Sequence, residues 1–156
     1  MTTAISVGIP VPKMLPITST WTLPFAVYMA YLSNTVVYHR LKNAKYTGDR
    51  LNDSASSDEL GNDRLFQACR SYANFTEKVP FALVLTGFAE LNGANRKALS
   101  WILGVLLALQ IAHSEFGLKR KDSIGIGRPI AYYGTEGIVA GLAVYGAYLV
   151  KGYWGL

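Results

Sequence analysis

The sequence predicts an all-α protein, a four-helix transmembrane bundle, from three observations. Apolar residues make up 51% of the 156 residues and charged residues 16%, against about 25% charged in ordinary soluble domains. The charges avoid most of four long segments and gather between them. The length suits one domain. We therefore expect a single integral membrane domain over 1–156, with spans near 18–39, 65–91, 98–118 and 129–150.

The first segment has no charged residue from Met14 to Tyr38. Twenty-five residues in a helix are enough to cross a bilayer core of about 30 Å. Pro24 lies near its start, where a helix tolerates proline best. No basic stretch precedes the segment and no small-residue cleavage site is apparent, so we expect an uncleaved span rather than a signal peptide. A polar loop follows over residues 40–64.

The second segment, 65–91, carries several polar residues in its first half and ends at an Asn92-Gly93 turn. The third, 98–118, is the least polar. It contains the uncharged run WILGVLLALQIA, and its polar end holds His113 and Glu115. Both segments are long enough to span a bilayer as helices.

The fourth segment, 129–150, holds one charge, Glu136. Gly137 and Gly141 have the spacing that favours close helix packing or oligomerisation. A soluble four-helix bundle would need a polar stripe on every helix. The third and fourth segments lack such a stripe over 99–109 and 137–149, which favours the membrane bundle.

Basic residues are distributed unequally between the two sides of the predicted bundle. Loops 40–64 and 119–128 hold nine of them: Arg40, Lys42, Lys45, Arg50, Arg64, Lys119, Arg120, Lys121 and Arg128. The opposite side holds four: Lys13, Arg96, Lys97 and Lys151. The positive-inside rule predicts that both loops are cytosolic and both termini lie across the membrane.

Ionisable residues inside a span suggest function, because burying them in lipid is costly. Arg70, Asn74 and Glu77 follow an i, i+4, i+7 spacing, which places them on one face of a helix. A guanidinium, an amide and a carboxylate together suit a ligand that carries both carboxylates and an ammonium group. Polar contacts between helices would explain the same pattern, so both interpretations stay open.

Further polar residues gather where the predicted helices meet one face of the membrane. In an up-and-down bundle, the ends of the first and third helices, with Arg40 and His113, lie beside the starts of the second and fourth, with Arg70 and Arg128. Tyr132 lies one turn beyond Arg128. Such a cluster is typical of the wall of an anion-accepting cavity.

Several other chemistries are excluded. The single Cys69 excludes an internal disulfide and a cysteine-based zinc cluster. Two histidines without paired carboxylates predict no metal site. The sequence has no Ser-His-Asp signature, Walker loop or dinucleotide fingerprint. Its lysines flank the spans, so we expect no nucleic acid partner.

The run RSYANFTEKVPFAL, beginning at Arg70, resembles the signature of the MAPEG family, membrane-associated proteins in eicosanoid and glutathione metabolism. That signature reads R-x-x-x-N-x-x-E and, in one branch, continues x-V-P. Further matches are ELNGA at 90–94, Ala112-His113, Gly117-Leu118 and Gly127-Arg128. The similarity covers about residues 23–150.

The resemblance implies a bundle assembled as a homotrimer, with glutathione as co-substrate bound between neighbouring subunits near the cytosolic face. It implies that Arg128 is the catalytic residue and stabilises the glutathione thiolate. It also implies a set of residues that bind glutathione: Arg40, Arg70, Asn74, Glu77, His113 and Tyr132.

The chemistry agrees with these roles, because a nearby permanent cation favours the thiolate of a thiol with a pKa of about 8.5. We therefore expect a membrane-bound glutathione transferase, which could also reduce lipid hydroperoxides. Its partners would be the lipid bilayer and a hydrophobic electrophile.

Two positions depart from the family pattern. Gln110 stands where many members carry an arginine, and Phe116-Gly117 takes the place of a tyrosine found in several eicosanoid enzymes. These departures point away from prostaglandin E or leukotriene C4 synthesis. They keep a second hypothesis open, a non-catalytic scaffold or accessory subunit of a larger membrane complex.

Overall fold

The structure, a computed structural model, describes residues 14–52, 61–119, 125 and 127–155. Its long helices are α1 (Pro16–Lys42), α3 (Arg64–Leu91), α4 (Arg96–Ile111) and α5 (Gly127–Leu149). A π-helix, η1 (Ala112–Leu118), continues α4, and a short 3-10 helix, η3 (Lys151–Trp154), follows α5. The described residues contain helices and no strand, so the all-α prediction is confirmed for this part of the chain.

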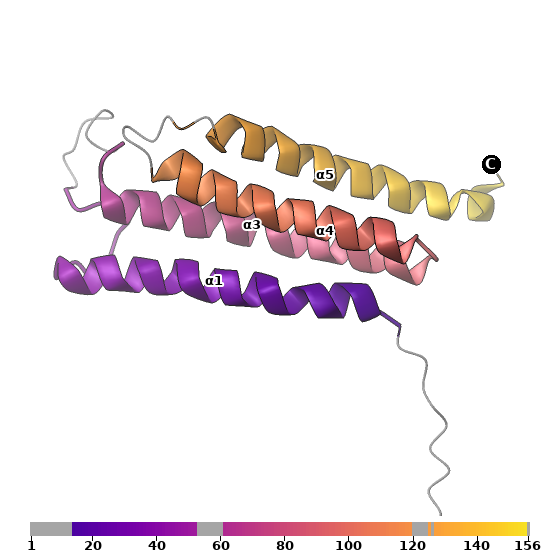
Figure 1. Cartoon of the computed structure of the whole chain (residues 1–156), viewed down its shortest axis with the longest axis horizontal. Helices are drawn as coiled ribbons and strands as arrows, with labels where there is room; N and C mark the ends of the chain where they lie inside the picture. Colours follow the sequence, from indigo (N-terminus) through magenta and orange to yellow (C-terminus); the bar gives the residue numbers. More distant parts are fainter. Residues whose placement is uncertain (1–13, 53–60, 120–124, 126, 156) are drawn as a thin grey trace, which may run out of the picture.

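The long helices lie alongside one another in a bundle (Figure 1). Helix α1 packs mainly against α3, and α5 packs against α3, α4 and η1. The end of α1, the start of α3, the end of η1 and the start of α5 lie together at one end of the bundle, called here the η1 end. The sequence predicts that Arg40, Arg70, His113 and Arg128 lie at one face of the membrane, and these residues lie on the four segments at the η1 end.

Two of the helices begin at a polar side chain that caps them. The Asp63 carboxylate accepts hydrogen bonds from the backbone N–H groups of Leu65 and Phe66, at 2.8 and 3.0 Å, at the start of α3. Asn95 caps α4 in the same way. Such caps satisfy backbone donors that have no partner inside the helix. The turn between α3 and α4 contains Gly93 with φ of 82°, a conformation that favours glycine.

Helix α1 has no side-chain cap of its own and is held at its start by Glu90 from the end of α3. The buried Glu90 carboxylate accepts hydrogen bonds from the backbone N–H groups of Ile17 and Thr18, both at 2.8 Å. The Thr18 hydroxyl donates a third, also at 2.8 Å. A carboxylate at a helix N-terminus is also favoured by the helix dipole. Glu90 therefore fixes α1 to α3 at the end of the bundle opposite η1.

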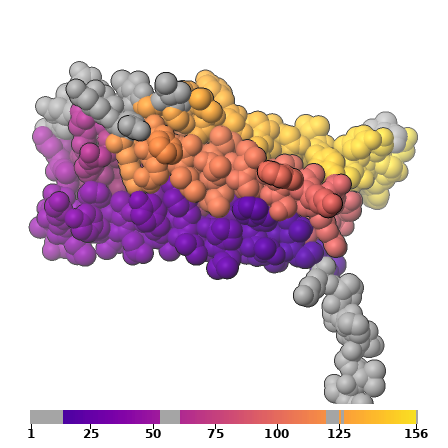
Figure 2. Space-filling view, in the orientation of Figure 1, coloured from indigo at the N-terminus to yellow at the C-terminus, as the bar shows by residue number. Residues whose placement is uncertain are grey.

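Apolar side chains fill the bundle and also cover much of its outside. Phe25, Phe75, Leu103 and Leu142 belong to one buried cluster that joins the four long helices. Many large apolar side chains point outward instead, among them Leu23, Val27, Trp101, Ile130 and Val144. The C-terminal part of α5 projects past its neighbours (Figure 2). A surface this apolar suits lipid or a neighbouring subunit better than water.

Within the described residues, one helix is long and apolar enough, by length and composition alone, to cross a bilayer. It is the continuous helix from Arg96 to Leu118. Helix α3 carries Arg64, Arg70, Glu77, Lys78 and Glu90 along its length. Helices α1 and α5 have few charges, but they contain many tyrosine, threonine or glycine residues of low hydropathy. Hydropathy alone therefore singles out the α4–η1 helix.

Candidate functional site

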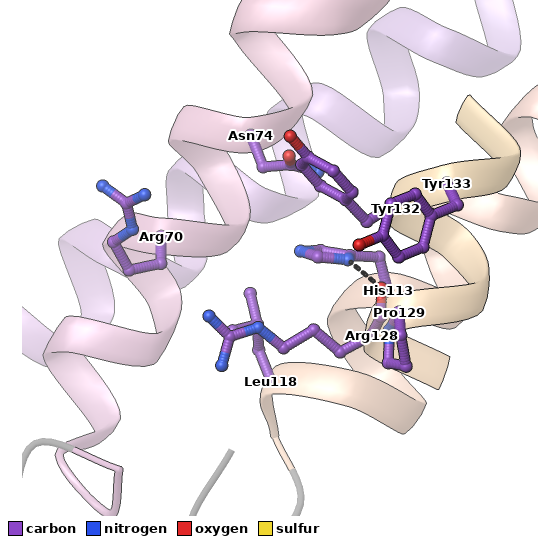
Figure 3. A pocket seen from close by; sticks show the side chains of 8 residues that line it. All are labelled: Arg70, Asn74, His113, Leu118, Arg128, Pro129, Tyr132 and Tyr133. Atoms are coloured by element: carbon purple, nitrogen blue, oxygen red, sulfur yellow. Dashed lines mark hydrogen bonds between the residues drawn. The ribbon is translucent and has the colours of Figure 1, made fainter. Parts of the chain in front are cut away.

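A pocket of about 340 Å³ opens at the η1 end, between α3, η1 and α5 (Figure 3). Its lining contains five of the seven residues that the sequence predicts for the site: Arg70, Asn74, His113, Arg128 and Tyr132. Three further residues complete it: Leu118, Pro129 and Tyr133. The volume lies at the lower end of the range of about 300–1,000 Å³ that is typical of small-molecule sites.

The wall formed by α3 carries Arg70 and Asn74 one turn apart, so both side chains lie on the same face of the helix. The opposite wall is the start of α5. From there the Arg128 side chain extends toward α3, with Tyr132 and Tyr133 a turn further along (Figure 3). Arg70 and Arg128 therefore present two cations from facing walls, and none of the eight lining residues is acidic.

The π-helix contributes His113 to the pocket, and single π-helical turns of this kind occur frequently at functional sites. The His113 Nδ1–H donates to the backbone carbonyl of Arg128 at 3.4 Å. Because a carbonyl can only accept, this contact places the ring proton on Nδ1. His113 therefore ties the start of α5 to η1 directly beneath the pocket.

Two glycines allow η1 and α5 to approach this closely. A Cβ atom at Gly117 would lie 3.0 Å from the Arg128 Cα, and one at Gly127 would lie 2.7 Å from the carbonyl oxygen of Ala112. Both distances are shorter than ordinary side-chain contacts, and both involve backbone atoms that cannot move independently. Glycine at 117 and 127 therefore sets the position of Arg128.

A chain of hydrogen bonds lies behind the pocket, inside the bundle. The Asn74 side-chain amide donates to Gln110 Oε1 at 3.3 Å, and Gln110 Nε2 donates to the Thr135 hydroxyl at 3.1 Å. Gln110 and Thr135 are fully buried. These bonds link α3, α4 and α5, so Gln110 is a partner of Asn74 and lies outside the pocket lining.

Lys78 and Glu136, predicted to lie inside spans, form an ion pair between α3 and α5. The Lys78 ammonium also lies 3.8 Å from the centroid of the Tyr132 ring. A cation at this distance over an aromatic face is attracted to the ring. Lys78 therefore supports a tyrosine that lines the pocket.

The remaining two predicted site residues, Arg40 and Glu77, lie outside this pocket. Arg40 lines a separate cavity of about 510 Å³ between α1 and α3, together with Cys69 and Tyr72. There Arg40 donates from a terminal guanidinium nitrogen to the Gly48 carbonyl at 3.1 Å. Glu77 is exposed on α3. One chain therefore does not bring all seven predicted residues to one cavity.

A polar cluster also fixes η1 to α1. Lys119 donates to Glu115 at 2.6 Å and to the Tyr31 hydroxyl at 2.9 Å. Burial lowers the pKa of Lys119, but the hydrogen bonds that Lys119 donates to Glu115 and Tyr31 outweigh this effect and hold that pKa above its usual value. Lys119 is therefore a stable cation at this end of the bundle.

Sequence reasoning missed part of the lining. Tyr133, Pro129 and Leu118 are adjacent to predicted site residues, but nothing in their spacing distinguishes them from other apolar residues of their segments. Thr135 supports Gln110 from three positions beyond Tyr132. A signal existed there, because a hydroxyl one turn from a site tyrosine lies close to the same face of the helix.

The site chemistry favours an anionic ligand. Two guanidiniums bind carboxylates well because their donors match carboxylate geometry. Asn74 and the tyrosines add uncharged polar groups. In the described residues no three His, Cys, Asp or Glu side chains group as a metal site would require.

Comparison with known proteins agrees with these features. The family model described as "MAPEG family" matches residues 18–148, which is most of the chain. Searches among curated proteins and among solved structures found no match. The matched range includes every residue of the pocket, the Lys78–Glu136 ion pair, and the hydrogen-bonded Gln110 and Thr135. The chain is a member of the MAPEG family, membrane-associated proteins of eicosanoid and glutathione metabolism.

Proposed function

We propose that this protein is a membrane-bound glutathione transferase that joins the glutathione thiolate to lipophilic electrophiles. The observation that carries the proposal is the pocket that Arg70 lines from α3 and Arg128 from the start of α5, together with Asn74, His113 and Tyr132. Family membership supports glutathione as the co-substrate. Glutathione has two carboxylates and an ammonium group, which two guanidiniums and an amide suit chemically.

In this proposal Arg128 is the catalytic residue. Its guanidinium is a permanent cation at the start of α5, where the helix dipole adds positive potential. Both effects favour the thiolate over the thiol. The thiolate sulfur then forms a bond to an electrophilic carbon of the second substrate, whose leaving group departs with the bonding electrons. No nucleophilic side chain is required.

Arg70 and Asn74 would hold the charged ends of glutathione, while His113 would act through the backbone of Arg128. The electrophile would enter from the lipid, beside apolar residues such as Pro129 and Leu118. The same activated thiolate could attack the oxygen of a lipid hydroperoxide. That peroxidase reaction would need a second glutathione to release the oxidised product.

We infer that the site is completed by a second copy of the chain in a homotrimer. Within one chain, Arg40 lines a different cavity from the pocket that holds Arg128. In a trimer, Arg40 of one subunit would reach glutathione bound in the pocket of its neighbour. Gly137 and Gly141 support assembly, because a Cβ atom at either would meet nothing of the described chain within 4 Å beyond its own chain neighbours and the backbone of its own helix.

We further propose that all four long helices span a membrane, with loops 40–64 and 119–128 in the cytosol. The exposed apolar side chains on α1, α4 and α5 support this arrangement. Residues 53–60, 120–124 and 126 of those loops lie outside the described residues. The partners would be lipid, glutathione and the hydrophobic electrophile.

A conjugation assay tests the proposed reaction. Protein purified in detergent is mixed with glutathione and a generic aryl halide, for the parent and for Arg128→Ala. We expect conjugation by the parent and a loss of roughly a hundredfold in the variant, the scale of other electrostatic contributions to catalysis. A parent that binds glutathione but conjugates no electrophile would instead support the second hypothesis, a non-catalytic accessory subunit. That hypothesis rests on Gln110 standing where many members carry an arginine.

A further inference from the structure

A buried chain of hydrogen bonds runs from Asn74 through Gln110 to Thr135, and the proposed reaction gives Gln110 and Thr135 no role. Gln110 is 3% exposed and Thr135 is 1% exposed. An amide and a hydroxyl at such depth would cost free energy if either lacked a partner. Each finds its partner in this chain, which makes the three side chains one unit.

The directions of these hydrogen bonds determine which atom Asn74 offers to the pocket. In the structure Gln110 turns its N–H group toward Thr135, whose hydroxyl oxygen accepts the hydrogen bond, and its carbonyl oxygen toward Asn74. A carbonyl oxygen can only accept, and Asn74 must therefore turn its own N–H group toward Gln110. The carbonyl oxygen of Asn74 is then the atom left for a ligand, on a side chain that reaches into the pocket beside Tyr132 (Figure 3).

An acceptor at this position changes what the pocket selects. Arg70 and Arg128 are donors only, so they recognise anionic groups of a ligand. The Asn74 oxygen adds one acceptor among them, and an ammonium or other N–H donor is its complement. The lining thus matches a ligand in which a donor lies close to carboxylates.

We infer that Gln110 is a positioning residue that holds Asn74 as a hydrogen-bond acceptor, so that the pocket selects ligands with an ammonium group beside a carboxylate. The inference rests on the proposed function, because the α-ammonium of the γ-glutamyl group of glutathione is such a donor. Gln110 touches no ligand itself and sets specificity through Asn74.

The test compares two ligands on three proteins. The ligands are glutathione and glutaryl-cysteinyl-glycine, which has the same shape but lacks the α-ammonium group. The proteins are the parent, Gln110→Met and Gln110→Glu, each purified in detergent and titrated by calorimetry. Methionine keeps the volume of glutamine and removes the hydrogen bonds, whereas glutamate keeps an acceptor for the Asn74 amide.

We expect the parent to bind glutathione roughly tenfold more tightly than the glutaryl analogue, since a hydrogen bond to a charged group is among the stronger kinds. Gln110→Met should bring this ratio of affinities close to one, mainly by weakening the binding of glutathione. Gln110→Glu should preserve most of the ratio. If Gln110 had a purely structural role, its replacement would weaken the binding of both ligands equally and leave the ratio unchanged.

Thr135→Val provides a second route if Gln110→Met fails to fold. It removes the hydroxyl that orients Gln110, and we expect it to reduce the ratio as well. A parental ratio retained in the folded Gln110→Met or Thr135→Val protein would overturn the inference and leave the proposed function intact. A parent that binds neither ligand would overturn both.

Discussion

The Lys78 ammonium lies 3.8 Å from the centroid of the Tyr132 ring and also pairs with Glu136. Lys78 and Glu136 are charged residues inside long, largely apolar segments of the sequence. In the structure they neutralise one another, and the Lys78 side chain is 14% exposed. The pair therefore secures a pocket tyrosine and keeps the Glu136 charge from opposing an anionic ligand.

We predict that Lys78→Met weakens glutathione binding by roughly three- to tenfold, the scale of a partly desolvated cation–π contact. The loss has two causes, a less constrained Tyr132 and an unpaired Glu136 carboxylate near the ligand. Calorimetric titration measures it. Adding Glu136→Gln to Lys78→Met should recover part of the affinity, because it removes the repulsion. Unchanged affinity in Lys78→Met would show that the contact has no role in binding.

Glu90 gives a prediction about stability alone. Glu90→Gln should lower the free energy of unfolding by about 1–2 kcal/mol, because the charged cap of α1 becomes neutral. Thermal unfolding in detergent, followed by circular dichroism, measures the change. Glutathione affinity should stay at the parental value, since Glu90 lies at the end of α3 away from the pocket. A large loss of affinity would contradict this separation.

Gly127 gives a prediction about the position of Arg128. Gly127→Ala places a methyl group against the carbonyl of Ala112 and should push the start of α5 away from η1. We expect about 1–3 kcal/mol of destabilisation, the usual cost of overpacking, together with a loss of conjugation. Gly146→Ala is the matched control, because a Cβ atom there meets nothing of the described chain within 4 Å beyond its own chain neighbours and the backbone of its own helix. Equal activity in the two variants would count against the packing explanation.

The fold could be predicted largely from the sequence, because absence of charge and helix-ending signals are local properties. The helices lie within a few residues of the expected segments, and Asn92-Gly93 does form the turn after α3. Asp63 and Asn95 precede helices as caps for the same local reason. The role of Glu90 could not be found in this way, since its partners lie more than seventy positions earlier in the chain.

The sequence predicts only part of the candidate site, because the spacing of residues along one helix does not determine which helices pack together. Helical spacing groups Arg70 with Asn74, but it is silent on which neighbouring helix faces them. The separation of Arg40 from the pocket depends on the packing of α1 against α3, which spacing does not encode. The buried pairing of Gln110 with Thr135 likewise depends on how α4 meets α5.

Assembly can be tested through the exposed glycines of α5. Gly137→Leu should reduce the trimer fraction, because a large side chain would obstruct close approach of a neighbouring helix. Chemical cross-linking or native mass spectrometry in detergent measures the fraction. The variant subunit should remain folded, as space around Gly137 is open within the described chain. A parent that is monomeric would refute the trimer.

The central claim is that Arg128 makes the bound glutathione a thiolate, and the thiolate absorbance on adding glutathione tests it most directly. In the parent we expect the thiolate to form near neutral pH, with an apparent pKa below the value of about 8.5 usual for a free thiol. Arg128→Lys, which keeps the charge, should retain part of this shift. Arg128→Ala should abolish it. A parent that binds glutathione without forming the thiolate, or an Arg128→Ala protein with the parental absorbance, would contradict the claim.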